Sequence, residues 1–117
     1  MADPLPPKAR RLVEARSGGI CEGCGQRAAT DIHHRKYRSR GGSHNLDNLL
    51  HLCGGDSGLA GGNHSGCHGI AHSKKGHDLG LSVHSWDDPG DVPVQYRGAR
   101  EVWLTLWGSA TDVRTTR

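Results

Sequence analysis

Four cysteines constrain this chain more than any other feature, because the rest of the sequence offers little material for a core. Only 33% of the 117 residues are hydrophobic, Phe is absent and Gly occurs 18 times. A core this thin rarely stabilises a domain of this size without disulfides or a structural metal. The sequence therefore predicts one small domain that its cysteines hold together.

The spacing of the cysteines favours a metal. Cys21 and Cys24 lie in the segment CEGCG, where two thiolates can bind one ion and the glycines let the backbone curl around it. Cys53 and Cys67 would complete a four-cysteine site for structural Zn²⁺, across a Gly-rich gap of 13 residues that we expect to bulge as a loop. The alternatives are four free thiols, or a redox pair that lacks its βαβ setting.

The start of the chain, MADPLPPKARR, lacks the apolar stretch of a secretory signal. No run approaches the roughly 18 apolar residues of a membrane span. We therefore expect a cytoplasmic protein without a membrane partner, in which thiols stay reduced.

Charge is distributed unevenly along the chain, whose net charge is +3. Residues 1–77 hold 11 Lys and Arg against 6 Asp and Glu, whereas residues 78–117 hold 4 against 6. Eight of the nine histidines also lie in the basic part. A polyanion would therefore meet residues 1–77, unless the charge is only a solvated surface.

Local signals indicate an α+β fold in three parts. Three prolines make residues 1–7 a flexible arm, and a short basic helix with Lys8, Arg10, Arg11 and Arg16 should follow and end at Ser17-Gly18-Gly19. Residues 29–37 favour a strand, Gly41-Gly42 a reversal, 46–48 a helical turn, 49–53 a second strand and 66–76 a helix. Residues 78–117 should add a small antiparallel sheet, with alternation at 79–83, a hairpin of 92–96 and 101–107, and Trp103 and Trp107 as packing residues.

Strand, reversal, strand and helix would bring four histidines together. His33 and His34 lie on the first strand, and His68 and His72 lie four residues apart on one helix face. Imidazoles from separate elements can converge on one divalent ion and leave other coordination positions open, as a catalytic metal site requires.

The segments IHHRKYRSRGG, NLDNLLHLC and CHGIAH, in this order behind CEGCG, resemble the HNH endonucleases of the ββα-metal class over roughly residues 10–77. The tail GLSVHSWDDPGDVPVQYRG is similar to the end of small HNH proteins from actinobacterial phages. The resemblance implies a ββα-metal nuclease core at 8–77 and a C-terminal β extension at 78–117. It also implies metal-dependent hydrolysis of DNA phosphodiester bonds with low sequence specificity, in phage DNA processing or packaging beside the terminase.

The resemblance assigns a role to each site residue. His34 corresponds to the general base that takes a proton from water, and Asn48 to the asparagine that fixes the loop between the strands. His33 and His68 correspond to ligands of a catalytic divalent ion, which could be Mg²⁺, Mn²⁺, Ni²⁺, Co²⁺ or Zn²⁺. His72 corresponds to a catalytic residue that contacts phosphate or assists the metal site. DNA phosphates are expected to meet Arg35, Lys36, Arg38, Arg40, Arg10 and Arg11.

Alternatives stay open at the site and for the function. Asp31 could replace His33 as a ligand, and the spare histidines are expected to be solvated, although His51 could instead support the site; these are His44, His51, His64 and His77. A non-catalytic zinc-ribbon module that binds nucleic acid would need neither His34, Asn48 nor His68. A ribonuclease or toxin nuclease is the third possibility. We expect a monomer or a weak dimer.

Overall fold

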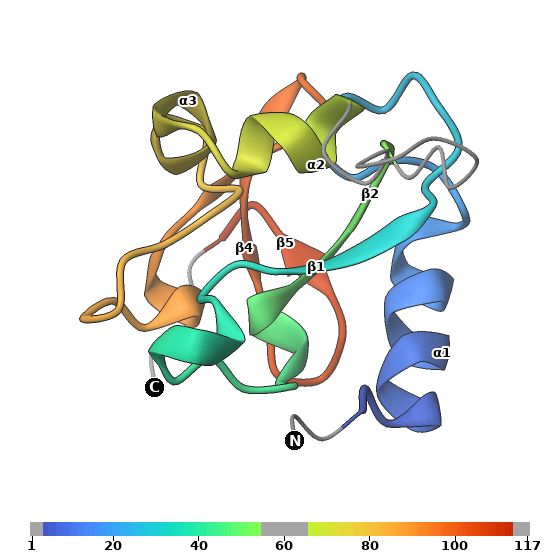
Figure 1. Cartoon of the computed structure of the whole chain (residues 1–117). Coiled ribbons are helices and arrows are strands. Elements are labelled where there is room, and N and C mark those ends of the chain that lie inside the picture. Colours follow the sequence, from blue (N-terminus) through green and yellow to red (C-terminus); the bar gives the residue numbers. More distant parts are fainter. Residues whose placement is uncertain (1–3, 55–65, 114–117) are drawn as a thin grey trace.

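The computed structural model describes residues 4–54 and 66–113, which form a β-hairpin, three helices and a C-terminal sheet (Figure 1). The elements are α1 (Pro7–Ser17), β1 (Asp31–His34), β2 (Leu49–Leu52), α2 (Gly66–Ala71), α3 (Lys74–Asp78), β3 (Val94–Tyr96), β4 (Arg100–Leu104) and β5 (Ala110–Thr111). Short 3-10 turns lie at Arg38–Arg40, Leu46–Asn48 and Pro89–Asp91. The mixed helix-and-sheet class is confirmed. In the part of the chain described, every helix is too short or too polar to cross a membrane.

Helix α1 starts and stops on the residues that its sequence favours. Pro7 opens the first turn, where the missing N–H costs no hydrogen bond, and Gly18 closes the helix at φ 63°. Val13 is fully buried, and Leu5 packs against the same apolar cluster. The predicted flexible arm is therefore wrong for Leu5, while residues 1–3 lie outside the described chain.

The two faces of the hairpin contact different parts of the molecule. Strands β1 and β2 pair antiparallel, from Asp31 opposite Leu52 to His34 opposite Leu49. Leu49 packs with α1, whereas Leu50 packs in a second cluster with α2 and the C-terminal sheet. Because side chains alternate along a strand, His33 shares the face of Leu50 and His34 the face of Leu49. The adjacent histidines therefore point toward different surroundings.

Two glycines shape the loop between β1 and β2. Gly41 has φ 87°, as the predicted reversal requires. Gly42 does not have a positive φ, but a Cβ there would lie 1.8 Å from the Lys36 carbonyl oxygen. Gly42 therefore allows the loop to fold back onto the residues that follow β1.

The helix predicted over 66–76 is interrupted, because α2 ends at Ala71 and α3 begins at Lys74. His72 N–H donates to the Gly69 carbonyl and Ser73 N–H to the Ile70 carbonyl, so the last turn of α2 is tight. Gly76 then packs against the end of α2, since a Cβ there would lie 2.5 Å from the Ala71 carbonyl oxygen. This close approach turns the chain back toward α2.

The C-terminal sheet has the strand order β3-β4-β5. The predicted hairpin is confirmed by β3 and β4, with Val94 opposite Val102, but β5 was not predicted. Residues 79–83 form no strand, although Leu81 is buried as their alternation suggests. Strand β4 stops at Leu104 because Thr105 N–H donates to the Ser109 carbonyl and closes a turn. This turn leaves Trp107 74% exposed, so its prediction as a packing residue is wrong.

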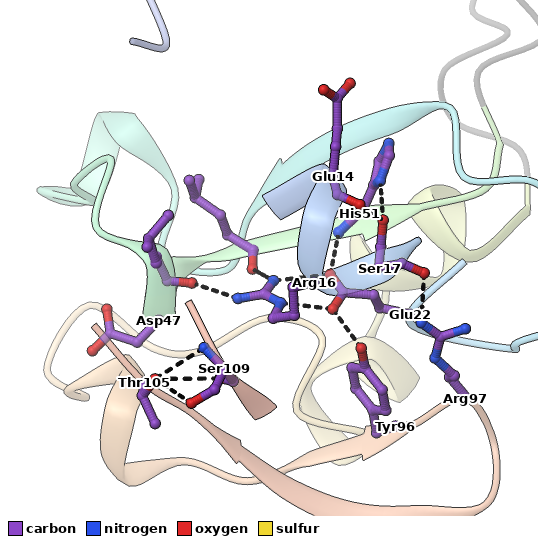
Figure 2. Close-up of polar contacts among 12 residues, drawn as sticks. Glu14, Arg16, Ser17, Glu22, Asp47, His51, Tyr96, Arg97, Thr105 and Ser109 are labelled. Carbon is purple, nitrogen blue, oxygen red and sulfur yellow. Dashed lines mark hydrogen bonds and ion pairs between the residues drawn. The ribbon is translucent and has the colours of Figure 1, made fainter. Parts of the chain in front are cut away.

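A buried ion pair joins α1 to the first cysteine pair (Figure 2). Arg16 donates to both carboxylate oxygens of Glu22, at 2.7 and 2.8 Å, and the Glu22 side chain is fully buried. The same carboxylate accepts from the Tyr96 hydroxyl at 2.7 Å and from the His51 backbone N–H at 2.8 Å. The expectation that Arg16 contributes to a basic surface is wrong, because its side chain is 3% exposed.

Candidate active site and zinc centre

The four cysteines meet at one point between the segment after α1, the end of β2 and the start of α2. Their sulfur atoms all lie within 4.8 Å of one another, and all four thiols are free of disulfides. Cys24 Sγ lies 3.9 Å from Cys53 Sγ. Four thiolates bound tetrahedrally at 2.3 Å place their sulfurs about 3.8 Å apart. The group therefore fits a metal such as zinc.

Backbone N–H groups surround the sulfur atoms. Cys21 Sγ accepts from the backbone N–H groups of Gly23, Cys24 and Cys53 at 3.2 to 3.4 Å. Burial alone would raise the pKa of the Cys24 thiol, but the Gln26 N–H and the neighbouring thiols bring this pKa down to about 7. Cys24 therefore has the accessible thiolate form that a metal ligand needs, whereas burial raises the pKa of the Cys53 and Cys67 thiols.

Three imidazoles form a second group of possible metal ligands, on the face of β1 that carries His33. His33 from β1, His68 from α2 and His72 from the residue after α2 each offer a ring nitrogen, and these atoms lie within 4.8 Å of one another. His33 is buried and His72 is exposed, so the cluster opens to solvent on the His72 side. The structure thus brings the two predicted ligands together with His72.

Hydrogen bonds orient two of these rings. His68 donates from Nδ1 to Asp31 Oδ2 at 2.7 Å, so its other ring nitrogen, Nε2, is the one that could bind an ion. His33 donates from Nε2 to the Leu81 carbonyl at 2.9 Å and to Ser82 Oγ at 3.2 Å, which leaves Nδ1. Such partners fix the tautomer of a metal-binding histidine. Asp31 therefore contacts His68, and the clustered ligand atoms belong to the three histidines. This arrangement differs from the alternative prediction that Asp31 replaces His33 as a ligand.

The electrostatics of the cluster favour a neutral His33 ring. Burial is the main cause that lowers the pKa of His33 to about 3, and the neighbouring His68 and His72 add to the effect. A protonated imidazole cannot bind a metal ion. The buried position of His33 therefore keeps this ring in the form that a metal requires.

His34 lies on the opposite face of β1 and contacts a different histidine. Its Nε2 lies 3.0 Å from His44 Nδ1, so one ring donates a hydrogen bond to the other and the tautomers set which ring is the donor. His44 belongs to the loop between the strands and is half-buried, so its prediction as a solvated histidine is wrong. No signal in the sequence distinguishes His44, because its contact with His34 depends on how the loop folds.

The other spare histidines have structural contacts as well. His51 is buried and its Nδ1 lies 2.7 Å from Ser17 Oγ, so it joins β2 to α1 and is not solvated. His77 is half-buried and stacks on His84, so its prediction as a solvated residue is also wrong. His64 lies outside the described residues.

Asn48 holds the two ends of the loop that carries His44. Its Oδ1 accepts from the Lys36 backbone N–H at 2.6 Å, and its Nδ2 donates to the Lys36 and Ser43 carbonyls at 3.1 and 2.9 Å. Asn48 is 1% exposed, so water does not compete for these hydrogen bonds. The side chain therefore fixes the loop immediately beside His34.

Arg35 cannot contact DNA, and this prediction is wrong. The side chain is fully buried and donates to the carbonyls of four residues, which are Gly80, Asp47, Pro89 and Val92. Arg35 instead ties the end of β1 to the C-terminal third of the chain. The other residues predicted to contact phosphate lie where solvent reaches them: Arg10, Arg11, Arg38 and Arg40 are exposed and Lys36 is half-buried.

Residues 21–55 match a family model described as HNH endonuclease. The matched segment contains the first cysteine pair, the paired histidines of β1, Asn48 and Cys53, and it is shorter than the resemblance over residues 10–77. It does not include α2, so His68 and His72 join the site through the geometry described above. No curated protein and no solved structure matches the chain. Residues 21–55 are thus similar to the HNH endonuclease family.

Proposed function

We propose that the protein is a metal-dependent HNH endonuclease that hydrolyses DNA phosphodiester bonds in a ββα-metal site. One observation carries this proposal: adjacent residues of β1 contribute to two separate sites. His33 faces two further imidazoles, while His34 faces the loop that Asn48 and His44 stabilise. A binding module would need the cysteines but would have no use for this division of roles.

In the proposed mechanism His33, His68 and His72 hold one divalent ion. Once bound, the ion would supply a positive charge that stabilises the scissile phosphate and the leaving 3′ oxygen. Three imidazoles favour Mn²⁺, Co²⁺, Ni²⁺ or Zn²⁺ over Mg²⁺, which prefers oxygen ligands. The four cysteines would hold a separate structural Zn²⁺.

His34 acts as the general base. The neutral ring takes a proton from a water molecule, the water oxygen attacks phosphorus, and the bond to the 3′ oxygen breaks. His44, at 3.0 Å, fixes the orientation and tautomer of His34, and Asn48 holds the loop that presents His44. In this scheme His34 reacts with the substrate, whereas His44 and Asn48 are positioning residues.

The substrate would be held through its backbone. Arg10, Arg11, Arg38 and Arg40 are exposed and Lys36 is half-buried, so all five can reach phosphates without reading base edges. We therefore propose low sequence specificity and an affinity that falls steeply with salt. We also propose that the protein is cytoplasmic and acts as a monomer or weak dimer. The resemblance to phage proteins suggests a role in phage DNA processing or packaging beside the terminase.

The test is cleavage of a supercoiled plasmid by the wild type and by His34→Ala. Each protein is assayed in EDTA and with added Mg²⁺, Mn²⁺, Ni²⁺, Co²⁺ or Zn²⁺, and circular dichroism verifies the fold. We expect nicking only with added metal, and a loss of 10²-fold or more in His34→Ala. The control Glu101→Gln, an exposed residue of β4, should cut like the wild type.

Either alternative function has its own result in this assay. If no variant cuts under any metal but all bind DNA, the protein is a zinc-ribbon binding module and the proposal fails. If RNA of the same sequence is cut and DNA is not, the protein is a ribonuclease.

A further inference from the structure

A column of three aromatic rings projects from α3 into solvent. The His77 ring stacks on His84 with centroids 4.4 Å apart and an interplanar angle of 22°. His84 in turn stacks on Trp86 at 4.4 Å and 7°. Trp86 ends the column and is 78% exposed.

The column is held in place by a hydrogen-bonded turn. His84 N–H donates to Asp87 Oδ2 at 3.0 Å, and Asp87 N–H donates to the His84 carbonyl at 3.0 Å. His84 covers one face of the Trp86 ring, and the high exposure of Trp86 means that the side chain contributes little to the core. An exposed indole supported on one face is suited to stacking against another flat ring.

Flat groups continue from the column toward the imidazole cluster. Arg40 lies close enough to His77 to help lower its pKa, after burial and His84 as the larger causes. The Arg40 guanidinium lies over the Tyr37 ring at 5.7 Å, and the Tyr37 ring lies 5.3 Å from that of His72. A series of planar side chains thus connects Trp86 to the candidate metal site, with Arg40 near His77 and over Tyr37, and Tyr37 beside His72.

The charges around this row favour a base over a phosphate at Trp86. Asp87 and Asp88 follow Trp86 directly and would repel a phosphate, whereas Arg40 lies between the column and the metal site and would attract one. The lowered pKa of His77 keeps its ring neutral at pH 7, so no repulsion between imidazolium ions disturbs the stack. Base stacking on aromatic side chains occurs with any base, because every base has a π-face.

We propose that Trp86, supported by His84 and His77, is a stacking platform for an unpaired base of the DNA strand that enters the imidazole site. This inference rests on the proposed endonuclease function and adds a substrate class to it. DNA with an accessible unpaired base, such as a single strand or a frayed end, binds better than an intact duplex.

Binding of a fluorescent single-stranded DNA of about 12 nucleotides tests the platform. All proteins carry His34→Ala and receive no added divalent ion, so that cleavage does not interfere. We expect Trp86→Ala to weaken binding about tenfold and Trp86→Phe to restore most of it. Trp107→Ala is the matched control, because Trp107 is 74% exposed but lies in the turn between β4 and β5.

A strand of the same length that carries abasic residues separates stacking from backbone contact. With this strand, Trp86→Ala and its parent should bind equally, since no base is present to stack. Equal affinity of Trp86→Ala and its parent for the normal strand would overturn the platform. An equal loss on both strands would overturn it as well, because the effect would then come from the backbone.

Plasmid cleavage tests the endonuclease function, and the binding assay tests the stacking platform, so one proposal can fail without the other. If the wild type does not cut plasmid, the endonuclease function is wrong, but the two oligonucleotides still decide whether Trp86 stacks on bases. If the wild type cuts as proposed and Trp86→Ala binds both strands normally, only the platform is wrong.

Discussion

At the scale of single residues, Tyr96 couples the stability of the fold to pH. Burial and the neighbouring Glu22 carboxylate raise the pKa of its hydroxyl above the ordinary value of 10.0. The unfolded chain loses this proton near pH 10, while the folded chain retains it to higher pH. The stabilising contribution of Tyr96 is therefore complete below pH 10 and is lost as pH rises through the folded pKa, by about 1.4 kcal/mol per pH unit.

Urea denaturation of the wild type and Tyr96→Phe between pH 8 and pH 11 measures this effect. At pH 8 the variant should be about 1 kcal/mol or more less stable, because Glu22 loses a buried hydrogen-bond donor. The difference between the two proteins should shrink above pH 10. If the difference in unfolding free energy between the two proteins stays constant up to pH 11, Tyr96 has the same pKa in the folded and the unfolded chain.

Residue identity alone could not predict side-chain contacts that depend on how the chain folds around the residue. Arg35 follows β1 like Arg38 and Arg40 and carries the same charge, yet only Arg35 is enclosed by backbone carbonyls of the C-terminal third. The contacts of His44 and Asp31 were not predicted either, because each lies beside a histidine that is distant in sequence or on another element. Cysteine spacing, in contrast, is a local signal, and it indicated the four-sulfur group correctly.

At the scale of elements, the hairpin was predictable because its signals are periodic and local. Gly41-Gly42, the turn at 46–48 and the apolar strand after it all lie where the sequence indicates. The break between α2 and α3 was not predictable from helix propensity, because it depends on the contact of Gly76 with the Ala71 backbone. Tertiary packing overrides propensity at such a position.

In the loop between β1 and β2, substitution by Ala should destabilise the protein by different amounts at the two neighbouring glycines. In Gly42→Ala the new methyl group would lie 1.8 Å from the Lys36 carbonyl oxygen, so the loop must shift. In Gly41→Ala no atom lies within 4 Å, and only the positive φ is unfavourable, at about 1 to 2 kcal/mol.

We therefore expect Gly42→Ala to lose more stability in urea than Gly41→Ala, and to lose plasmid cleavage in addition. The second effect follows because the shifted backbone carries the Asn48 contacts beside His34. Equal unfolding free energies for the two variants would contradict the close approach at Gly42. Gly41→Asn should be close to the wild type, since Asn tolerates positive φ.

At the scale of the whole molecule, the cysteines are part of the main core. Cys21, Cys53 and Cys67 pack in one cluster with Leu50 and Leu52 of the hairpin and with apolar residues of the C-terminal sheet, which are Val94, Tyr96, Val102 and Leu104. The cysteines thus add to the small number of apolar residues in the cluster where the hairpin meets the C-terminal sheet. The stability of the C-terminal sheet should therefore depend on the metal that we propose the cysteines hold.

Removal of this metal by a strong chelator under reducing conditions should unfold the entire chain. We expect the far-UV circular dichroism and the tryptophan emission to change together, since Trp103 of β4 reports on the C-terminal sheet. Cys24→Ser should behave like the chelated protein, whereas His68→Ala should stay folded and retain one zinc per chain, because it leaves all four thiols in place. A native tryptophan signal after chelation would mean that the C-terminal sheet folds without the zinc centre. In that case the buried hydrogen bonds of Arg35 to the Val92 carbonyl and of Tyr96 to Glu22, and not the metal, would join this third of the chain to the rest.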